Sequence, residues 1–219
     1  MKHPPGALVV VDLQQDYFRA PSLSRLRPRL VQRVRRAAEA ARAAGAPVIE
    51  VRTENARHPS TWALNMREDG QPVALAGSDG AAPLPELDLR PDHVVVKTRD
   101  SAYHHTTLGL VLDSHHNDAY ALCGVTTESC IAATATDGYA HDHRVSILVD
   151  CVASDVPAQL EPTLERLSRL YRQEGVRADR VQFRPPQARP TPVTDCRGAT
   201  LHTGLPPTDR LEDEPCAPT

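Results

Sequence analysis

The run ALVVVD at residues 7–12 constrains the fold more than any other feature of the chain. It is apolar until its last residue, which is a carboxylate, and shows no alternation of apolar and polar positions. A strand with one face in water would alternate, so this run predicts a strand buried on both faces of a parallel sheet.

Further short runs rich in β-branched residues recur along the chain, and helix candidates separate them. Strands that alternate with helices form crossover units, which place a parallel sheet between two layers of helices. We therefore predict an α/β fold, a three-layer α-β-α sandwich with a mainly parallel, Rossmann-like sheet, over residues 1–184. The predicted strands are 7–12, 47–51, 93–97, 118–124 and 145–150, and the predicted helices are 24–44, 105–116, 128–142 and 158–174.

Two segments interrupt this alternation. Residues 53–92 form a long polar stretch with several glycines and prolines. A connection of this length inside a domain is usually functional, so we expect substrate contacts there. Residues 185–219 are rich in proline and carry few clustered apolar residues, so we expect a disordered or loosely docked tail.

The charge pattern argues against two classes of partner. The formal net charge is −3 and the two signs are interspersed, so the chain lacks the broad positive field that gathers nucleic acid or an anionic membrane. Arginines do cluster between residues 25 and 36, on a predicted helix whose other face carries Leu26, Leu30, Val34 and Ala38. We interpret these arginines as a solvated helix face.

Hydropathy and cysteine spacing predict a cytoplasmic location. No apolar stretch approaches the length of a bilayer span, and the first residues lack the pattern of a secretory signal. The five cysteines are odd in number and form no CxxC pair, which favours a reducing compartment.

Three polar residues follow the ends of predicted strands. Asp12 closes the first strand, Lys97 closes the third, and Cys130 follows the fourth after the turn GVTTES. Each has an ordinary explanation alone, because such an Asp often forms a turn, such a Lys reaches water, and a lone Cys is commonly core. Ligands of open parallel sheets bind beyond the carboxyl ends of the strands, so the three together indicate one cleft.

Four stretches of the chain carry a family resemblance. They are DLQQDY (12–17), GSDGAAPLPEL (77–87), KTRDSAYHHTTL (97–108) and CGVTTESCIAATATDGYAHDHRVSILVD (123–150). In order and spacing they resemble the signature blocks of the isochorismatase-like hydrolases. The resemblance implies a catalytic triad of Asp12, Lys97 and Cys130, and a cis peptide between Val125 and Thr126.

The implied chemistry agrees with these residue types. Cys130 would begin a helix, where the macrodipole favours a thiolate, and Lys97 would add a positive charge. Asp12 would take the thiol proton, pass it to a leaving nitrogen and then activate the water that hydrolyses the thioester. The backbone N–H groups of Thr126 and Cys130 would face the oxyanion. This chemistry requires no cofactor.

Three kinds of function are open within the resemblance. The first is hydrolysis of a non-peptide C–N bond in a small amide, ureido or lactam substrate, which the retained Cys130 favours. The second is isochorismatase-type cleavage of a vinyl ether with Asp12 as the acid. The third is a catalytically silent binding or assembly protein, or a redox sensor, although the intact triad argues against silence. The segment RTENARH (52–58) lacks the Asp-x-His metal motif of nicotinamidases, which disfavours that activity.

Several other residues are candidates for the substrate pocket. Trp62 and Asn65 either fold back on the core with their loop or help to close a lid over the substrate. Tyr17, Phe18 and Tyr103 follow residues of the catalytic blocks, and we expect them to line the walls of the pocket.

The remaining expectations concern Glu128, metals and assembly. Glu128 lies beside the nucleophile, where it either addresses a substrate amine or ureido group or partners the helix dipole. The ten histidines invite a metal, but adjacent histidines on a helix point in different directions, so we predict surface histidines and no metal site. Because a partner subunit often shapes such pockets, we expect a homodimer or homotetramer that acts on a small molecule.

Overall fold

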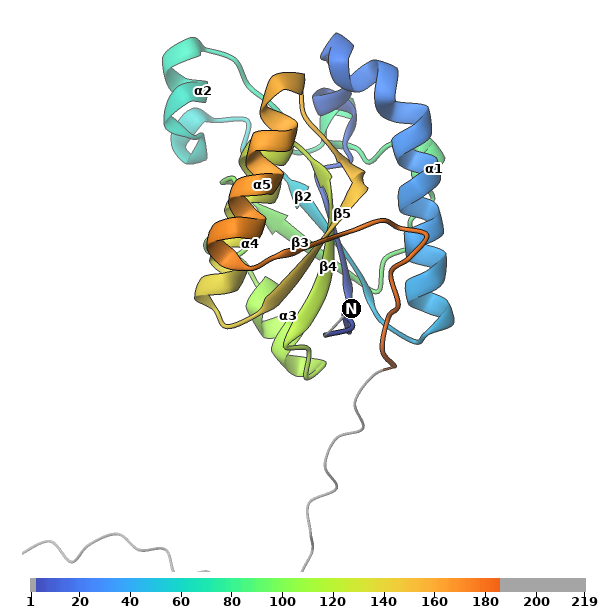
Figure 1. Cartoon of the computed structure of the whole chain (residues 1–219). Coiled ribbons are helices and arrows are strands. Elements are labelled where there is room, and N and C mark those ends of the chain that lie inside the picture. Colours follow the sequence, from blue (N-terminus) through green and yellow to red (C-terminus); the bar gives the residue numbers. More distant parts are fainter. Residues whose placement is uncertain (1–2, 186–219) are drawn as a thin grey trace, which may run out of the picture. The chain divides into compact units, whose positions relative to one another are not determined.

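The computed structural model describes residues 3–185 (Figure 1). The expectation of a disordered or loosely docked tail over 185–219 falls, apart from Pro185, outside these described residues. Among the described helices, none combines the length and the apolar character that a membrane span requires.

The described chain is built on a six-stranded, all-parallel sheet with strand order β3-β2-β1-β4-β5-β6. The order changes direction between β1 and β4, and ligands of such sheets bind at the carboxyl ends beside this switch point. The sheet confirms the predicted α/β fold. Its strands are β1 (Leu8–Val11), β2 (Val48–Thr53), β3 (His93–Lys97), β4 (Ala119–Val125), β5 (Arg144–Ala153) and β6 (Glu174–Val176).

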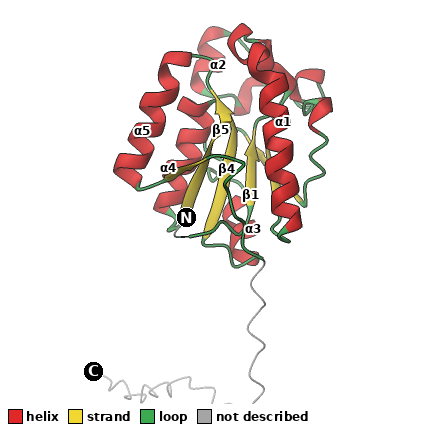
Figure 2. Ribbon diagram, turned by 45° about the vertical axis from the view of Figure 1, so that its right-hand side comes forward, coloured by secondary structure: helices red, strands yellow, loops and turns green. Residues whose placement is uncertain are grey.

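Helices cover both faces of the sheet. Figure 1 and Figure 2 show α1 on one side and α4 and α5 on the other. The apolar run of β1 is buried on both faces, as predicted. Leu8 and Val10 pack with α1, while Val9 and Val11 pack with the helices of the opposite face. The helices are α1 (Pro21–Ala43), α2 (Leu64–Asp69), α3 (Leu108–Ser114), α4 (Ala132–Ala140) and α5 (Leu160–Tyr171).

Two sequence expectations about helices need correction. Leu26, placed on the buried face of α1, is 44% exposed, whereas Leu30, Val34 and Ala38 are buried. A spacing of four residues turns about 40° beyond a full helical turn, so Leu26 lies about 120° around the helix from Ala38. The predicted helix 158–174 is shorter in the structure, where α5 ends at Tyr171. Glu174, the last residue of the prediction, begins the short strand β6 instead.

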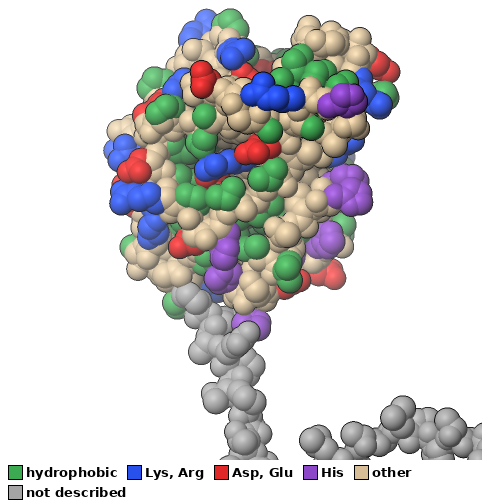
Figure 3. All heavy atoms as spheres, turned by 180° about the vertical axis from the view of Figure 1, so that it is seen from behind, with side chains coloured by type: hydrophobic (Ala, Val, Ile, Leu, Met, Phe, Trp, Pro, Cys, Tyr) green, Lys and Arg blue, Asp and Glu red, His purple; other side chains and the backbone are tan. Residues whose placement is uncertain are grey.

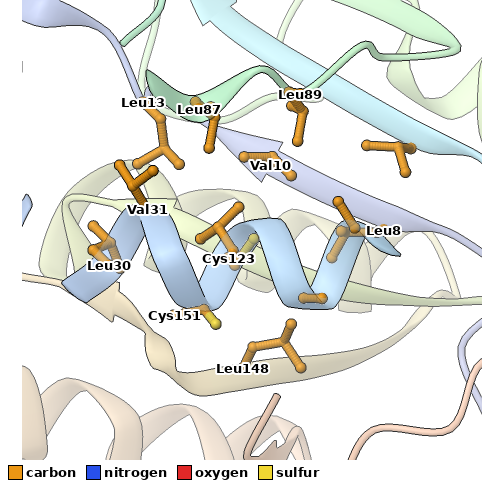
Figure 4. Packing of buried hydrophobic residues seen from close by; sticks show 14 of the residues in the cluster. Leu8, Val10, Leu13, Leu30, Val31, Leu87, Leu89, Cys123, Leu148 and Cys151 are labelled. Carbon is orange, nitrogen blue, oxygen red and sulfur yellow. The ribbon is translucent and has the colours of Figure 1, made fainter. Parts of the chain in front are cut away.

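The segment 53–92 is more ordered than its polar sequence suggests. It contains α2 and three 3-10 turns. An isolated bridge from Pro83 to Gln14 ties it to the body of the protein, and a second joins Asn55 and Leu75 within the segment. Leu87 and Leu89 lie beside Val10 in the core (Figure 4). Figure 2 shows α2 at the end of the molecule toward which the strand arrows point, which is the end that carries the candidate site.

Candidate active site

Asp12, Lys97 and Cys130 meet at the carboxyl end of the sheet. Asp12 directly follows β1, Lys97 is the last residue of β3, and Cys130 lies in a π-helical turn, Thr127–Ile131, between β4 and α4. Lys97 Nζ lies 2.8 Å from Asp12 Oδ2 and donates a hydrogen bond to Cys130 Sγ at 3.4 Å. All three residues are buried, and Cys130 is 5% exposed.

The backbone around these residues has unusual conformations. Asp12 has φ 54°, a left-handed conformation that Asp tolerates better than most residues. Gly124 has φ 128°, and a Cβ at this position would overlap the carbonyl oxygen of Val11 on the neighbouring strand. The peptide between Val125 and Thr126 is cis, as the family resemblance implies.

Thr53, the last residue of β2, is a fourth polar side chain at this edge. Its hydroxyl donates to Asp12 Oδ1 at 2.8 Å and accepts from Lys97 Nζ at 2.8 Å and from the Tyr17 hydroxyl at 3.0 Å. The sequence analysis did not include Thr53 among the site residues. The available signal was its place two residues after the predicted strand 47–51, at the end of the sheet where Asp12 and Lys97 also close strands.

Gln14 fixes the main chain at Thr53. The Thr53 N–H donates to Gln14 Oε1 at 2.8 Å, and Gln14 Nε2 donates to the carbonyl of Thr53 at 2.8 Å and to that of Ala81 at 2.7 Å. Gln14 is fully buried. Its amide therefore satisfies backbone groups that lie beyond the regular strand pairing and holds the end of β2 beside Asp12.

Burial and a neighbouring carboxylate act against the thiolate expected at Cys130. Burial and the Asp12 carboxylate raise the pKa of the Cys130 thiol far above its usual value, although the Lys97 charge acts in the opposite direction. Burial alone would lower the pKa of Lys97, but Asp12 and Cys130 raise it overall. These directions favour a neutral thiol beside a charged ammonium, so that the thiol needs a base when it reacts.

Two of the three aromatic candidates lie away from the triad. Tyr17 reaches it through Thr53, as described above. Phe18 is instead 4% exposed in the core cluster that packs with α1, because the 3-10 turn Gln15–Arg19 directs it inward. The Tyr103 hydroxyl lies 3.2 Å from His143 Nδ1, and its ring stacks on His141 at 4.7 Å, so it packs at the far end of α4.

A cavity of about 590 Å³ lies between α2, the residues that follow β3, and α4. Asn65, one of the candidate pocket residues, is among its lining residues. Trp62 is half-buried, and its indole N–H donates to the carbonyl of Ala56 at 2.7 Å. The charged residues that line the cavity are Glu68, Arg99, Asp100 and Asp137.

Glu128 lies two residues before Cys130 and is half-buried. Burial, followed by the side chain of Asp155, raises the pKa of its carboxyl group. The structure thus places another acidic side chain beside Glu128.

The histidines are more varied than predicted. In the face shown in Figure 3, histidine side chains lie at several separate places. His104 and His105 are exposed, as expected, but the His143 side chain is 8% exposed and lies under Tyr103. His93 and His115 contact each other, with 2.8 Å between their Nε2 atoms. Within residues 3–185, no group of three or more His, Cys, Asp or Glu side chains is arranged to hold a metal ion.

Comparisons with known proteins agree with this architecture. The family model of the isochorismatase domain matches residues 6–208. Two proteins named streptothricin hydrolase, from Streptomyces noursei, are each 31% identical over 159 residues, or 69% and 71% of this chain. The matches span 51% and 57% of those two proteins, so the chain covers little more than half their length.

Two further relatives match over more of their own length. A probable inactive nicotinamidase from Arabidopsis thaliana is 31% identical over 161 residues, which are 69% of this chain and 82% of that protein. The crystal structure of N-carbamoylsarcosine amidase from Thermoplasma acidophilum is 25% identical with a TM-score of 0.69, covering 82% of this chain and 98% of that one. The chain therefore belongs to the isochorismatase family of hydrolases.

Proposed function

We propose that this chain is a cysteine hydrolase that cleaves a non-peptide C–N bond of a small amide, ureido or lactam substrate. The observation that carries the proposal is the contact of Lys97 with both Asp12 and Cys130 in a buried site at the sheet's switch point. A nucleophile, a base and a fixed positive charge within hydrogen-bonding reach form an arrangement suited to acyl transfer.

In the first half-reaction the neutral thiol is activated as it attacks. Asp12 takes the proton of Cys130 while Sγ bonds to the carbonyl carbon, and Lys97, which contacts both side chains, holds the carboxylate near the thiol. The C–N bond then breaks, and Asp12 returns the proton to the leaving nitrogen. Cys130 is left as a thioester, and the charged Lys97 stabilises the developing anions throughout.

In the second half-reaction Asp12 takes a proton from water, which attacks the thioester carbonyl. The C–S bond then breaks as Asp12 returns this proton to Sγ, so that the carboxylic acid leaves and the thiol of Cys130 is restored. In both halves the negative charge develops on the carbonyl oxygen, for which we assign the backbone N–H groups of Thr126 and Cys130 as donors.

The triad side chains do not line the cavity, but Lys97 Nζ donates to the carbonyl of Arg99, a lining residue, at 3.1 Å. We therefore take the cavity as the approach to the site, and its lining suggests the charge of the substrate. Its lining includes the carboxylates of Glu68, Asp100 and Asp137. Arg99 also lines it, but Arg99 Nη1 donates to the carbonyl oxygens of Thr61 and Thr98, each at 2.7 Å. We therefore propose that the cavity favours neutral or cationic substrates over anionic ones.

The relatives support C–N hydrolysis over vinyl-ether cleavage. One similar structure is an amidase for N-carbamoylsarcosine, and two related sequences carry the name streptothricin hydrolase. A probable inactive nicotinamidase is also related, so family membership alone does not guarantee activity. Our proposal therefore rests on the intact site of this chain.

The test is a screen of small amides, ureido acids and lactams, streptothricin included, with amine or ammonia release as the signal. Cys130→Ala and Cys130→Ser should abolish turnover while the thermal midpoint stays close to that of the wild type. Undiminished turnover in either variant would overturn the cysteine mechanism. Turnover of a vinyl ether that survives Cys130→Ala would point to acid catalysis by Asp12 instead.

A further inference from the structure

We propose that Thr53 is a positioning residue, which holds the Asp12 carboxylate so that Oδ2 faces the thiol of Cys130. The inference rests on the proposed cysteine mechanism and adds to it a residue that acts through Asp12 rather than on the substrate. The proposal follows from the number of hydrogen bonds that the single hydroxyl group of Thr53 can donate and accept.

A threonine hydroxyl has one proton to donate and two lone pairs to accept, and Thr53 uses all three. Lys97 Nζ donates to Oγ1 at 2.8 Å and the Tyr17 hydroxyl donates at 3.0 Å, which fills both lone pairs. The proton of Thr53 is therefore directed to Asp12 Oδ1, 2.8 Å away. The contacts leave this hydroxyl one consistent orientation.

Both donors keep their protons in this environment. Burial, followed by the charges of Asp12 and Cys130, raises the pKa of Tyr17 well above its usual value. The pKa of Lys97 is also raised, as described above. Because neither donor is lost near neutral pH, Thr53 does not need to exchange its donor and acceptor roles during the reaction.

The two oxygens of Asp12 are made unequal by these contacts. Oδ1 accepts the proton of Thr53, whereas Oδ2 has Lys97 Nζ at 2.8 Å without the angles of a hydrogen bond. A lone pair of Oδ2 is thus available for the thiol proton. Without the Thr53 hydroxyl, Oδ1 loses a donor and the carboxylate can rotate toward Lys97, away from the orientation that receives the proton.

The backbone of Thr53 is held independently of its side chain, so a substitution can test the hydroxyl alone. Gln14 bonds the N–H and the carbonyl of Thr53, so the backbone position does not depend on the hydroxyl. Thr53 is 6% exposed and Asp12 is fully buried, so bulk water does not readily replace a lost donor. A change of side chain should then act on the orientation of Asp12 and leave the end of β2 in place.

The experiment compares two variants that each keep one half of the side chain. Thr53→Val removes the hydroxyl and keeps the shape, so kcat for the amide identified in the substrate screen should fall about 100-fold, with KM changed by less than about twofold. Thr53→Ser keeps the hydroxyl and should retain kcat within about threefold. A packing role predicts the reverse order, because Ser leaves a methyl-sized hole and Val does not.

A second measurement needs no substrate. The rate at which iodoacetamide alkylates Cys130, followed by mass mapping from pH 6 to pH 10, reports proton transfer from the thiol. Thr53→Val should slow this rate at least about tenfold at pH 7, and Thr53→Ser should restore it. Thr163→Val, at a buried threonine of α5, is the matched control and should change neither kcat nor labelling.

The outcomes separate the two proposals. If the wild type hydrolyses an amide and Thr53→Val matches it in kcat and in labelling, the role of Thr53 is overturned and the proposed function stands. If no substrate is turned over but labelling still follows the hydroxyl, the proposed function fails and the role of Thr53 toward Asp12 and Cys130 stands. Should Thr53→Val not fold, Thr53→Ala replaces it as the variant without a hydroxyl, judged by the same two readouts.

Discussion

The ammonium of Lys97 lies 2.8 Å from the carboxylate of Asp12, and both groups are buried at the carboxyl end of the sheet. Two opposite charges out of water depend on each other, because each offsets the desolvation cost of the other. The same ammonium donates to Cys130, so the ion pair links the stability of the fold to the proposed chemistry.

Loss of this lysine should destabilise the protein as well as inactivate it. Lys97→Met keeps the length of the side chain but leaves Asp12 as an unpaired buried charge, which typically costs about 3–5 kcal/mol of unfolding free energy. Urea denaturation at pH 7 measures this loss. Arg90→Met is the control, because Arg90 pairs with Asp88 on the surface at 3.1 Å and its loss should cost less than about 1 kcal/mol. Equal losses for the two variants would contradict a buried, mutually dependent pair.

The buried cysteines predict a loss of stability at alkaline pH. Burial raises the pKa of Cys123 and Cys130 well above the usual value, and burial together with Asp150 raises that of Cys151 to about 12. The unfolded chain ionises its thiols from about pH 9, whereas the folded chain binds these protons more tightly. The unfolding free energy should therefore keep its full thiol contribution below pH 9 and lose it progressively toward pH 12.

Cys151→Ala provides the control for this pH dependence. Removing one raised thiol should reduce the loss of unfolding free energy between pH 9 and pH 10.5 relative to the wild type, whatever the variant costs at pH 7. Chemical denaturation at each pH in the presence of a reductant gives both curves. If the unfolding free energy of the variant and of the wild type falls equally steeply with pH, ionisation of Cys151 does not contribute to the loss of stability.

Gly124 is predicted to resist even the smallest side chain. It combines φ 128° with a close approach to the carbonyl of Val11, so Gly124→Ala meets both backbone strain and steric overlap. Gly70→Ala is the matched control, because Gly70 has φ 63° but nothing lies within 4 Å of its added Cβ. We expect Gly70→Ala to cost about 1 kcal/mol and Gly124→Ala at least about 2 kcal/mol more. Thermal denaturation checks which variant loses more stability. A Gly124→Ala variant as stable as Gly70→Ala would contradict the prediction.

The sequence predicted the fold because each element carries its own signal. The run at 7–12 required a sheet covered on both faces, and the structure buries Leu8 and Val10 on one face and Val9 and Val11 on the other. The order of strands and helices then limited the topology. Asp12, Lys97 and Cys130 were placed at one edge because parallel strands end there together.

The features that were missed depend on neighbours that a sequence does not show. Thr53 becomes part of the site because β2 pairs with β3 in the register that sets it beside Lys97. Phe18 and Tyr103 turned away from the pocket because short turns, rather than strands or helices, set their direction. The raised pKa of Cys130 follows from burial beside Asp12, which outweighs the charge of the lysine that the sequence indicated.

The acidic lining of the cavity predicts a measurable charge preference. Asp100 lines the cavity three residues after Lys97, and its charge is the smallest of those that raise the pKa of Cys130. For a pair of amides of equal size, one neutral and one with an added ammonium, Asp100→Asn should lower kcat/KM of the cationic amide about tenfold, equivalent to about 1.4 kcal/mol. The neutral amide should change by less than about twofold, because it makes no use of the carboxylate charge.

The control for this prediction must change the net charge equally without touching the cavity. Asp88→Asn does so, because Asp88 pairs with Arg90 and lines a different cavity beside β2. Added salt should weaken the wild-type preference for the cation and leave Asp100→Asn nearly unaffected, since screening acts on the same interaction. Equal losses for Asp100→Asn and Asp88→Asn would trace the preference to the net charge of the protein. If Asp100→Asn leaves the ratio of kcat/KM for the cationic and the neutral amide unchanged, the substrate approaches Cys130 from another side.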